Sequence, residues 1–270
     1  MRVSGDTPLA NRTGLRAALG PAVRAVENVG LTVSLTWRTL LWLFRRPFRL
    51  SQVLAQMEFI GVQSVFIVGF TGVFSGMVVA LQTSYALRTF SAEGRVGGIV
   101  AVSLTREVAP VFAAIMVTAR AGSSIAAELG NMRVTEQIDA LTTMGVSAVQ
   151  YLLSPRLLAS VLMVPLLCVL YSAVGMAGAY LVAVRWLGGD PGVFAQSVRD
   201  LAVVEDLRMG VIKAAVFGFI IAALANRHGF YAAGGAKGVG LATTRAVVET
   251  CVTILVANYV LTQALLDGRY

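Results

Sequence analysis

Three charged residues stand inside long apolar stretches of the sequence. Arg106 and Glu107 are neighbours in the run LTREVAP, and Lys213 lies in the run VIKA. A charged side chain at the centre of a bilayer costs about 2.5 kcal/mol or more, so it usually faces the protein interior and pairs with an opposite charge. One interpretation is a structural ion pair between Glu107 and Lys213 that ties two spans together. The alternative is a substrate-facing or conformational role for these charges.

Other residue types that carry chemistry are sparse. The single histidine, His228, has no second histidine or cysteine near it in the sequence, which argues against a metal site. The glycine-rich stretch at 234–240 (GGAKGVG) lacks the Gly-Lys-Ser/Thr order of a phosphate-binding loop and is typical of a flexible turn. There is no Gly-x-Ser-x-Gly motif, and the carboxylates are dispersed. We therefore expect no metal, no cofactor and no enzymatic activity on this chain.

The elements that hold the buried charges must be membrane-spanning helices. The chain has 270 residues, of which 57% are hydrophobic and 13% charged, and its mean hydropathy is +0.76. Residues 59–87, 157–184 and 250–266 contain no Asp, Glu, Lys or Arg. Such a composition excludes a secreted disulfide scaffold, a disordered chain and a soluble nucleic-acid binder. Cys168 and Cys251 fall in two of these stretches, where we expect buried thiols.

Five segments are long enough to cross a bilayer, whose core of about 30 Å needs about 20 helical residues. They are residues 60–87, 97–119, 157–184, 207–226 and 247–266. Before them, residues 31–44 (LTVSLTWRTLLWLF) are apolar but short, and a basic run follows directly. This pattern predicts an interfacial helix along the membrane, with a sixth short span as the alternative. We expect an all-α integral membrane protein, with an N-terminal segment at 1–50 and a membrane-spanning domain at 51–270.

Lys and Arg are distributed unevenly over the two sides of the predicted spans. With a cytoplasmic N-terminus, the inner side holds Arg2, Arg12, Arg16, Arg24, Arg38, Arg45, Arg46, Arg49, Arg120, Arg133, Arg156, Arg227, Lys237 and Arg245. The outer side holds Arg88, Arg95, Arg185, Arg199, Arg208 and Arg269. An excess of basic residues is typical of cytoplasmic loops, so we expect the N-terminus in the cytoplasm and the C-terminus outside. The net charge of +8 then reflects topology, and no nucleic-acid partner is expected.

Two connections between the predicted spans are longer than a turn. Within residues 120–156, the stretch 123–141 (SSIAAELGNMRVTEQIDAL) repeats apolar residues at helical spacing. This spacing predicts an amphipathic cytoplasmic helix with a break near Gly130. The outer connection at 185–206 is long enough for a short surface helix.

Three runs carry a resemblance to a known family: VFSGMVVALQ (73–82), LTREVAPVFAAIMVTARAGSSIAAELGNMRVTEQIDALTTMGV (104–146) and GAKGVGLATTRAVV (235–248). They resemble the MlaE/YrbE family, the permease subunits of MCE-associated ABC lipid transporters, and the resemblance covers nearly the whole chain after residue 50. It implies a homodimeric permease with an interfacial helix and five spans. It also implies a separate cytoplasmic ABC ATPase, often a small STAS-domain protein, and a periplasmic MCE-domain protein.

The resemblance also implies site residues. The helix at 123–141 would be the coupling helix that docks on the ATPase, with contacts at Glu128, Met132, Arg133 and Glu136. A lipid cavity between the protomers would be lined by Val79, Ala86, Leu87, Phe90 and Val108. At a position where relatives carry aspartate in the last span, this chain has Asn258, so a charge pair with Lys213 cannot form there.

Together these features predict the permease subunit of an ATP-driven transporter in a bacterial inner membrane. Its expected substrate is phospholipid moved between the inner and outer membranes. A permease for another hydrophobic substrate, such as a sterol or fatty acid, is the nearest alternative. A proton-coupled secondary transporter that uses Glu107 is a further alternative, disfavoured by the odd number of spans and by the lack of the internal repeats that many such transporters have.

Overall fold

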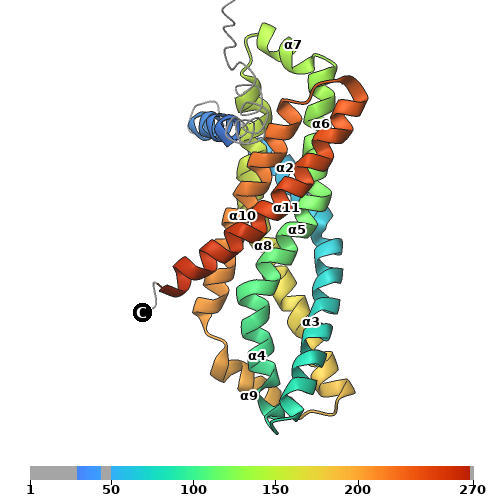
Figure 1. Ribbon diagram of the computed structural model, residues 1–270, viewed down its shortest axis with the longest axis vertical. Coiled ribbons are helices and arrows are strands. Elements are labelled where there is room, and N and C mark those ends of the chain that lie inside the picture. The colour runs from blue at the N-terminus through green and yellow to red at the C-terminus, as the bar shows by residue number, and fades with distance from the viewer. Residues whose placement is uncertain (1–28, 44–49, 268–270) are drawn as a thin grey trace, which may run out of the picture.

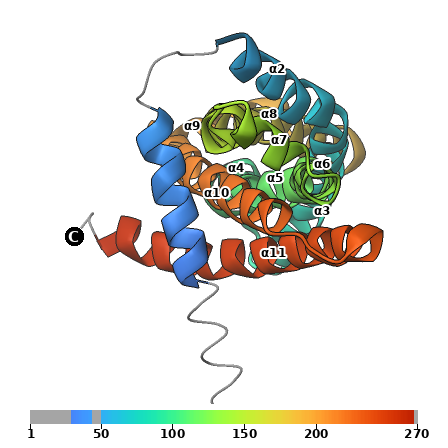
Figure 2. The ribbon, with the colours of Figure 1, turned by 90° about the horizontal axis from the view of Figure 1, so that it is seen from above.

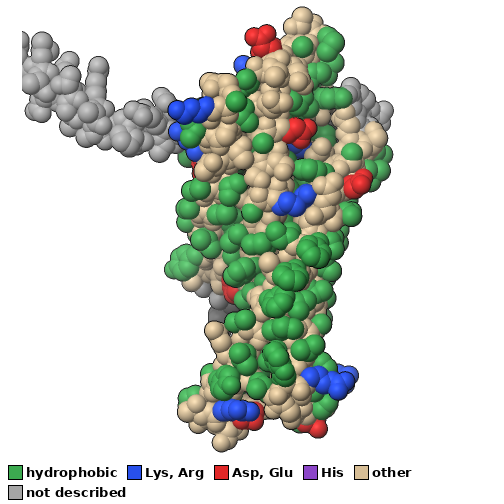
Figure 3. Space-filling model, turned by 90° about the vertical axis from the view of Figure 1, so that its right-hand side faces the viewer, with side chains coloured by type: hydrophobic (Ala, Val, Ile, Leu, Met, Phe, Trp, Pro, Cys, Tyr) green, Lys and Arg blue, Asp and Glu red, His purple; other side chains and the backbone are tan. Residues whose placement is uncertain are grey.

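The computed structural model describes residues 29–43 and 50–267, and every regular element in these ranges is a helix. Five helical segments are long and apolar enough to cross a membrane: Leu50–Arg88, Glu93–Val134, Val149–Trp186, Val204–Phe230 and Gly235–Leu265. The chain is therefore an all-α integral membrane protein, and the five predicted spans are confirmed. Figure 1 shows these segments as one elongated bundle. On the face in Figure 3, hydrophobic side chains cover the middle of the bundle and charged side chains gather toward its ends.

The first three spans are each built from several helical elements, whereas the last two are the single helices α10 and α11. In chain order the α-helices are α2 (Leu50–Ile60), α3 (Val65–Arg88), α4 (Val96–Ser103), α5 (Ala109–Val117), α6 (Ser123–Val134), α7 (Gln137–Thr143), α8 (Ser154–Tyr180), α9 (Pro191–Leu201), α10 (Val204–Phe230) and α11 (Gly235–Asp267). Short 3-10 turns precede α3 and α4, at η1 (Val62–Ser64) and η2 (Glu93–Arg95). Wider π-helical turns lie at η3 (Leu104–Val108), η4 (Thr118–Gly122), η5 (Val149–Leu153) and η6 (Leu181–Trp186).

The two ends of the bundle differ. At one end α6 projects beyond the other helices and turns into α7 at the tip, and we call this the α7 end (Figure 1). At the opposite end, the α9 end, α9 fills the connection between the third and fourth spans, as the sequence predicted. Asp190 caps α9 because its Oδ1 accepts the Val193 N–H at 2.9 Å, and Pro191 occupies the first turn, where its missing N–H costs nothing.

Glycines bring α3 and α8 into backbone contact along the centre of the bundle. A Cβ atom on Gly76 would lie 1.9 Å from the Gly175 carbonyl oxygen, and one on Gly178 would lie 2.4 Å from the Val73 carbonyl oxygen. In a membrane, lipid tails are as apolar as the side chains, so helices associate through this kind of close packing. These contacts therefore fix α3 on one side of α8, and α10 packs on α8 as well.

The second span continues as a helix well beyond its predicted end at residue 119. It runs through η4 and α6 to Val134, so the break expected near Gly130 is wrong. Gly130 instead gives α11 room, because a Cβ there would lie 3.2 Å from a Val239 methyl group. The chain turns later, at Glu136, which has a left-handed backbone with φ of 60°.

The N-terminal apolar segment is helical over residues 29–43. Figures 1 and 2 show this helix crossing the bundle at a steep angle near the α7 end, and it is not one of the five candidate spans. Leu35 and Thr39 are buried, and Ser154 Oγ donates to the Thr39 carbonyl oxygen at 3.2 Å. This helix is therefore anchored on the start of α8. The basic run that follows it, at residues 45–49, lies outside the described residues.

The close contact of α3 with α8 leads to a first prediction. Gly76→Ala should lower the melting temperature of the purified protein, because overpacking a close contact costs about 1–3 kcal/mol. Gly69→Ala is the matched control, two turns earlier in α3, where a Cβ would meet nothing within 4 Å. It should melt at or above the wild-type temperature, since alanine favours a helix over glycine by about 1 kcal/mol. Equal melting temperatures for the two variants would contradict the glycine contact.

Candidate functional site

Pro110 leaves a backbone carbonyl oxygen of the second span free to accept a hydrogen bond from a buried cation. Proline has no N–H, so the carbonyl oxygen of Arg106, four residues earlier, loses its normal α-helical donor. The backbone widens here into the π-helical turn η3, in which the Ala109 N–H bonds to the Leu104 carbonyl oxygen. The Arg106 carbonyl oxygen accepts a hydrogen bond from Lys213 Nζ at 3.1 Å instead. Pro110, which interrupts the helical hydrogen bonding, thus lies only a few residues after the charged Arg106 and Glu107.

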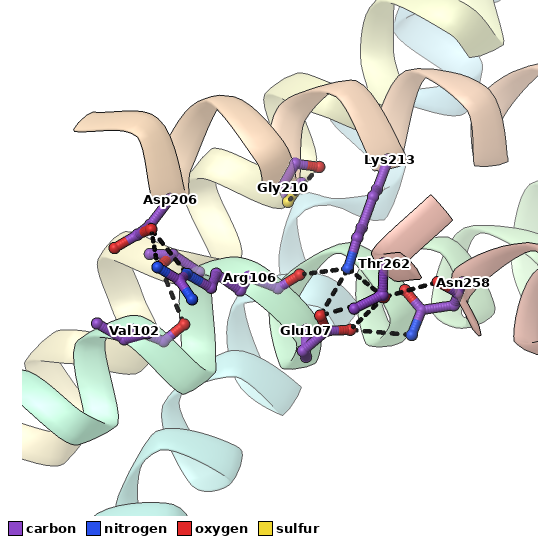
Figure 4. Close-up of polar contacts among 10 residues, drawn as sticks. Val102, Arg106, Glu107, Asp206, Gly210, Lys213, Asn258 and Thr262 are labelled. Carbon is purple, nitrogen blue, oxygen red and sulfur yellow. Dashed lines mark hydrogen bonds and ion pairs between the residues drawn. The ribbon is translucent and has the colours of Figure 1, made fainter. Parts of the chain in front are cut away.

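Lys213 of α10 is the centre of this polar network. Its side chain is 0% exposed, and its ammonium group has three N–H donors. These donate to Glu107 Oε1 at 2.7 Å, to Thr262 Oγ1 at 2.8 Å and to the Arg106 carbonyl oxygen (Figure 4). Every donor of the buried ammonium is therefore satisfied, and the ion pair that the sequence suggested is present.

The last span supplies the remaining members of the network. Asn258 Nδ2 donates to Glu107 Oε2 at 3.0 Å, and the Thr262 hydroxyl donates to the Asn258 carbonyl oxygen at 2.7 Å (Figure 4). Asn258 thus joins the network through Glu107 and not through Lys213. A neutral amide suits this place, because Glu107 and Lys213 already balance in charge and an aspartate would add an unpaired negative charge beside Glu107.

Arg106 points to a different partner, one that sequence reasoning missed. Its Nη2 lies 2.6 Å from Asp206 Oδ1, and Asp206 is 1% exposed. Asp206 Oδ2 also accepts the Val203 N–H at 3.1 Å, so this carboxylate caps the first turn of α10. Asp206 is the last residue of the outer connection predicted at residues 185–206. The one clue was its spacing of two helical turns from Lys213, which puts both residues on one face of α10.

The two ion pairs fix the position of α10 along the second span. Along the second span the positive Arg106 is followed by the negative Glu107. Along α10 the order of charges is reversed, because the negative Asp206, the partner of Arg106, precedes the positive Lys213, the partner of Glu107. A shift of α10 by two turns would bring like charges together, which is unfavourable in a low-dielectric interior. Gly210 makes the approach possible, because a Cβ there would lie 2.2 Å from the Thr105 carbonyl oxygen.

The predicted coupling residues fall into two groups at the α7 end. Glu128 and Met132 belong to the packed part of α6. Glu128 Oε1 lies 2.8 Å from Nη2 of Arg156, and the Arg156 side chain is 3% exposed. Met132 packs on the hydrophobic core. Arg133 and Glu136 lie at the turn from α6 to α7, where Arg133 Nη1 lies 2.6 Å from Asp139 Oδ1. Glu128 itself is 54% exposed, and a charge reversal there would leave the buried Arg156 guanidinium without its partner.

The predicted lipid-contacting residues lie mainly along α3 and just beyond it. Ala86 and Phe90 are exposed in the single chain. Val79 and Leu87 are half-buried against a small cluster that includes Val100. Val108 follows Glu107 directly and packs against the main core. The structure thus places four of these residues near the α9 half of α3 and the fifth beside the polar network.

Metal binding finds no support in the described part of the chain. Within residues 29–43 and 50–267, no three His, Cys, Asp or Glu side chains are grouped so as to hold a metal ion. His228 instead lies beside a carboxylate, with its Nε2 at 2.6 Å from Glu249 Oε2.

Known proteins are similar to this chain over most of its length. The family model described as Permease MlaE matches residues 53–264. A probable ABC transporter permease protein of Rickettsia bellii is 39% identical over 94% of this chain and 96% of its own length. The intermembrane phospholipid transport system permease protein MlaE of Haemophilus influenzae is 38% identical over 77% of this chain and 80% of its own length. The chloroplastic protein TRIGALACTOSYLDIACYLGLYCEROL 1 of Arabidopsis thaliana is 36% identical over 80% of this chain.

The buried pair leads to a second prediction. Glu107→Gln and Lys213→Met should each lower the melting temperature of the purified protein, because a buried charge without its partner costs about 3–5 kcal/mol. Glu107→Gln should have the larger effect, since it strands an ammonium that is 0% exposed, whereas Lys213→Met leaves a carboxylate that is 41% exposed. The double variant should recover most of the loss. Single variants that melt like the wild type would exclude a stabilising role for the pair.

Proposed function

Since the chain belongs to the MlaE permease family, we propose that it is the membrane-spanning subunit of an ATP-driven transporter that moves phospholipid between the inner and outer membranes of a bacterium. The observation that carries this proposal is the match to the Haemophilus phospholipid permease, which spans most of both chains. The five apolar spans supply the membrane domain, and the described helices contain no phosphate-binding loop sequence. ATP hydrolysis is therefore assigned to a separate ABC ATPase.

The polar network supports a homodimer with a cavity between the protomers. In a single chain, Glu107 is 41% exposed and Arg106 is 27% exposed, although both lie well inside the second span. Charged groups at this depth face protein or water, not lipid tails. A second protomer across a cavity with a polar floor would give both charged groups suitable surroundings.

This cavity is the proposed substrate site. Val79, Ala86, Leu87, Phe90 and Val108 would line it with apolar side chains suited to acyl chains. In this arrangement the lipid tails contact α3, while the charged groups around Glu107 lie at the depth of the cavity floor. Phospholipid is preferred over a sterol or fatty acid because of the relative named above.

The turn from α6 to α7 is the proposed contact with the ATPase. It stands at the tip of the α7 end (Figure 1), and Ile138 is the only buried residue of α7. Met144, just after α7, is 69% exposed, which gives the tip an apolar anchor for a groove on a partner. Arg133 and Glu136 lie in the turn that directly precedes α7. A STAS-domain protein would associate at this same cytoplasmic side, and an MCE-domain protein would meet the α9 end.

We place the α7 end in the cytoplasm and the α9 end in the periplasm, because the basic residues favour a cytoplasmic N-terminus. The helix at residues 29–43 then lies near the cytoplasmic surface of the inner membrane. In this orientation the C-terminus is periplasmic, although residues 268–270 lie outside the described part of the chain.

A native mass spectrum of the tagged protein, extracted gently from its own membranes, tests the proposal as a whole. We expect two copies of this chain, an ABC ATPase and bound phospholipid. A monomer that carries no ATPase would contradict the proposal. A bound sterol or fatty acid in place of phospholipid would assign the alternative substrate.

The proposed orientation yields a third prediction. In a chain with Cys168→Ala and Cys251→Ala, Ala195→Cys on α9 should react with an impermeant thiol reagent in intact spheroplasts. Thr143→Cys on α7 should react only after the membrane is permeabilised. Both positions are exposed in the single chain, so when the chain is produced without its partner proteins, access to the reagent depends on the side of the membrane. The reverse pattern would invert the topology.

The proposed ATPase contact yields a fourth prediction. Met144→Asp and Arg133→Glu should leave the melting temperature nearly unchanged, since the exposed Arg133–Asp139 pair contributes at most about 1 kcal/mol. Both should reduce co-purification of the ATPase several-fold, because charge mismatch at an interface costs several kcal/mol. Arg208→Glu, an exposed charge reversal near the α9 end, is the control and should retain the ATPase. Full retention by all three variants would exclude α7 as the coupling element.

A further inference from the structure

A basic cavity lies near the α7 end, away from the polar network. It has a volume of about 450 Å³ and lies between Leu31 of the N-terminal helix, the end of α10 and the first turns of α11. Its charged lining consists of Arg227, Arg245 and Glu249, and the imidazole of His228 also lines it. Arg227 Nη1 lies 3.0 Å from Glu249 Oε1, so these two charges balance. Arg245 then leaves the cavity with a net positive charge.

Arg245 is the available cation of this cavity. It is exposed, and among the described residues it forms neither an ion pair nor a hydrogen bond. An unpaired guanidinium offers a planar fork of N–H donors, which matches the oxygens of a phosphate group. The cavity can therefore accept an anion, and Arg227 beside it adds a second guanidinium already held in place by Glu249.

An apolar groove lies about one helical turn from the cavity, toward the middle of the bundle. Its volume is about 320 Å³, and Trp37, Phe219, Ala223, Leu224 and Thr253 are among its lining residues. Leu224 lies one helical turn before Arg227 on α10, and Thr253 lies one turn after Glu249 on α11. Thr32, next to Leu31, completes the groove from the N-terminal helix. The same three helices thus line a basic compartment and, directly deeper, an apolar one.

We propose that the cavity and groove together bind one anionic phospholipid, with its phosphate at Arg245 and an acyl chain along the groove under Trp37. The order of the two compartments matches a lipid that stands in the membrane leaflet at the α7 end. Basic pockets between helices on the cytoplasmic side are suited to anionic headgroups. Phospholipid also explains why the groove needs no polar lining, since an acyl chain has no group to satisfy.

This site is separate from the proposed transport cavity. Lys213 and Arg227 are both on α10, fourteen residues apart, which corresponds to about 21 Å along the helix. A lipid here would connect the N-terminal helix to α10 and α11, in addition to the direct contact of that helix with α8. The site therefore goes beyond the proposed function. Only the choice of leaflet depends on the proposed orientation, and binding requires no ATPase.

The test uses Trp37 as a probe inside the groove. Trp42→Phe and Trp186→Phe leave Trp37 as the single tryptophan of the full chain, which is reconstituted into vesicles. Phosphatidylglycerol or phosphatidylcholine with brominated acyl chains is then added, and quenching of Trp37 reports the chain that lies beside it. We expect brominated phosphatidylglycerol to quench with about tenfold higher apparent affinity than brominated phosphatidylcholine, since a charge-assisted bond at Arg245 favours the anionic lipid.

Three variants separate the possible causes. Arg245→Gln should remove most of the preference for phosphatidylglycerol. Lys237→Gln removes an equal charge from an exposed position on the same helix outside the cavity lining, and it should leave the preference intact. Ala223→Phe fills the groove and should weaken quenching by both lipids. Inorganic phosphate at millimolar concentration should not displace the lipid, whereas displacement by phosphate alone would assign the cavity to free anions.

Equal quenching by the two lipids in the wild type would overturn the proposal, because the groove would then hold ordinary boundary lipid. An equal loss of preference in Lys237→Gln and Arg245→Gln would also overturn it, since general surface charge would explain the result. Melting temperatures of the variants check that each is folded. If a variant is not, the wild-type comparison of the two lipids still decides. These outcomes are independent of whether the chain transports lipid.

Discussion

A fully buried ammonium group sets the main constraint on this structure. Lys213 has no contact with solvent, so its three donors need three acceptors inside the bundle. Two spans supply them: the second gives the Glu107 carboxylate and the Arg106 carbonyl oxygen that Pro110 leaves without its usual donor, and the last gives the Thr262 hydroxyl. These bonds fix both spans relative to α10. The positions of the second, fourth and fifth spans therefore depend on one side chain.

The rest of the bundle is held mainly by close backbone contact. Gly76 and Gly178 allow α3 and α8 to touch, and Gly210 allows α10 to reach the π-helical turn that carries the charges. Within lipid, apolar side chains gain little by leaving one apolar environment for another, so such contacts and polar bonds supply most of the specificity. The last span has a large exposed apolar face, including Val252, Val256 and Tyr259. Its ties to Glu107 through Asn258 and Thr262 thus matter more for its position than they would for a fully enclosed helix.

This division of roles suits a transporter that must move without losing its fold. The α3–α8 contact is a close backbone contact, whereas the last span combines a small polar contact with an exposed apolar face. The turn between α6 and α7 follows directly on the helix of the second span, which carries Arg106 and Glu107. A displacement of α7 by a bound partner would therefore reach the polar network along one continuous helical segment.

The sequence by itself determined the class of the protein and the number of spans, and it offered the pairing of Glu107 with Lys213 as one of two interpretations. Apolar length is a local property, and the cost of a charge in lipid leaves few partners to choose from. It did not determine the partner of Arg106, the role of Thr262 or the tie between Glu128 and Arg156. Arg106 and Asp206 lie 100 residues apart, and their contact depends on how α10 is rotated and where it crosses the second span. The tertiary structure decided these contacts, and also the use of Gly130 as a packing surface, because helix crossings are set by many side chains at once and leave no periodic pattern in the sequence.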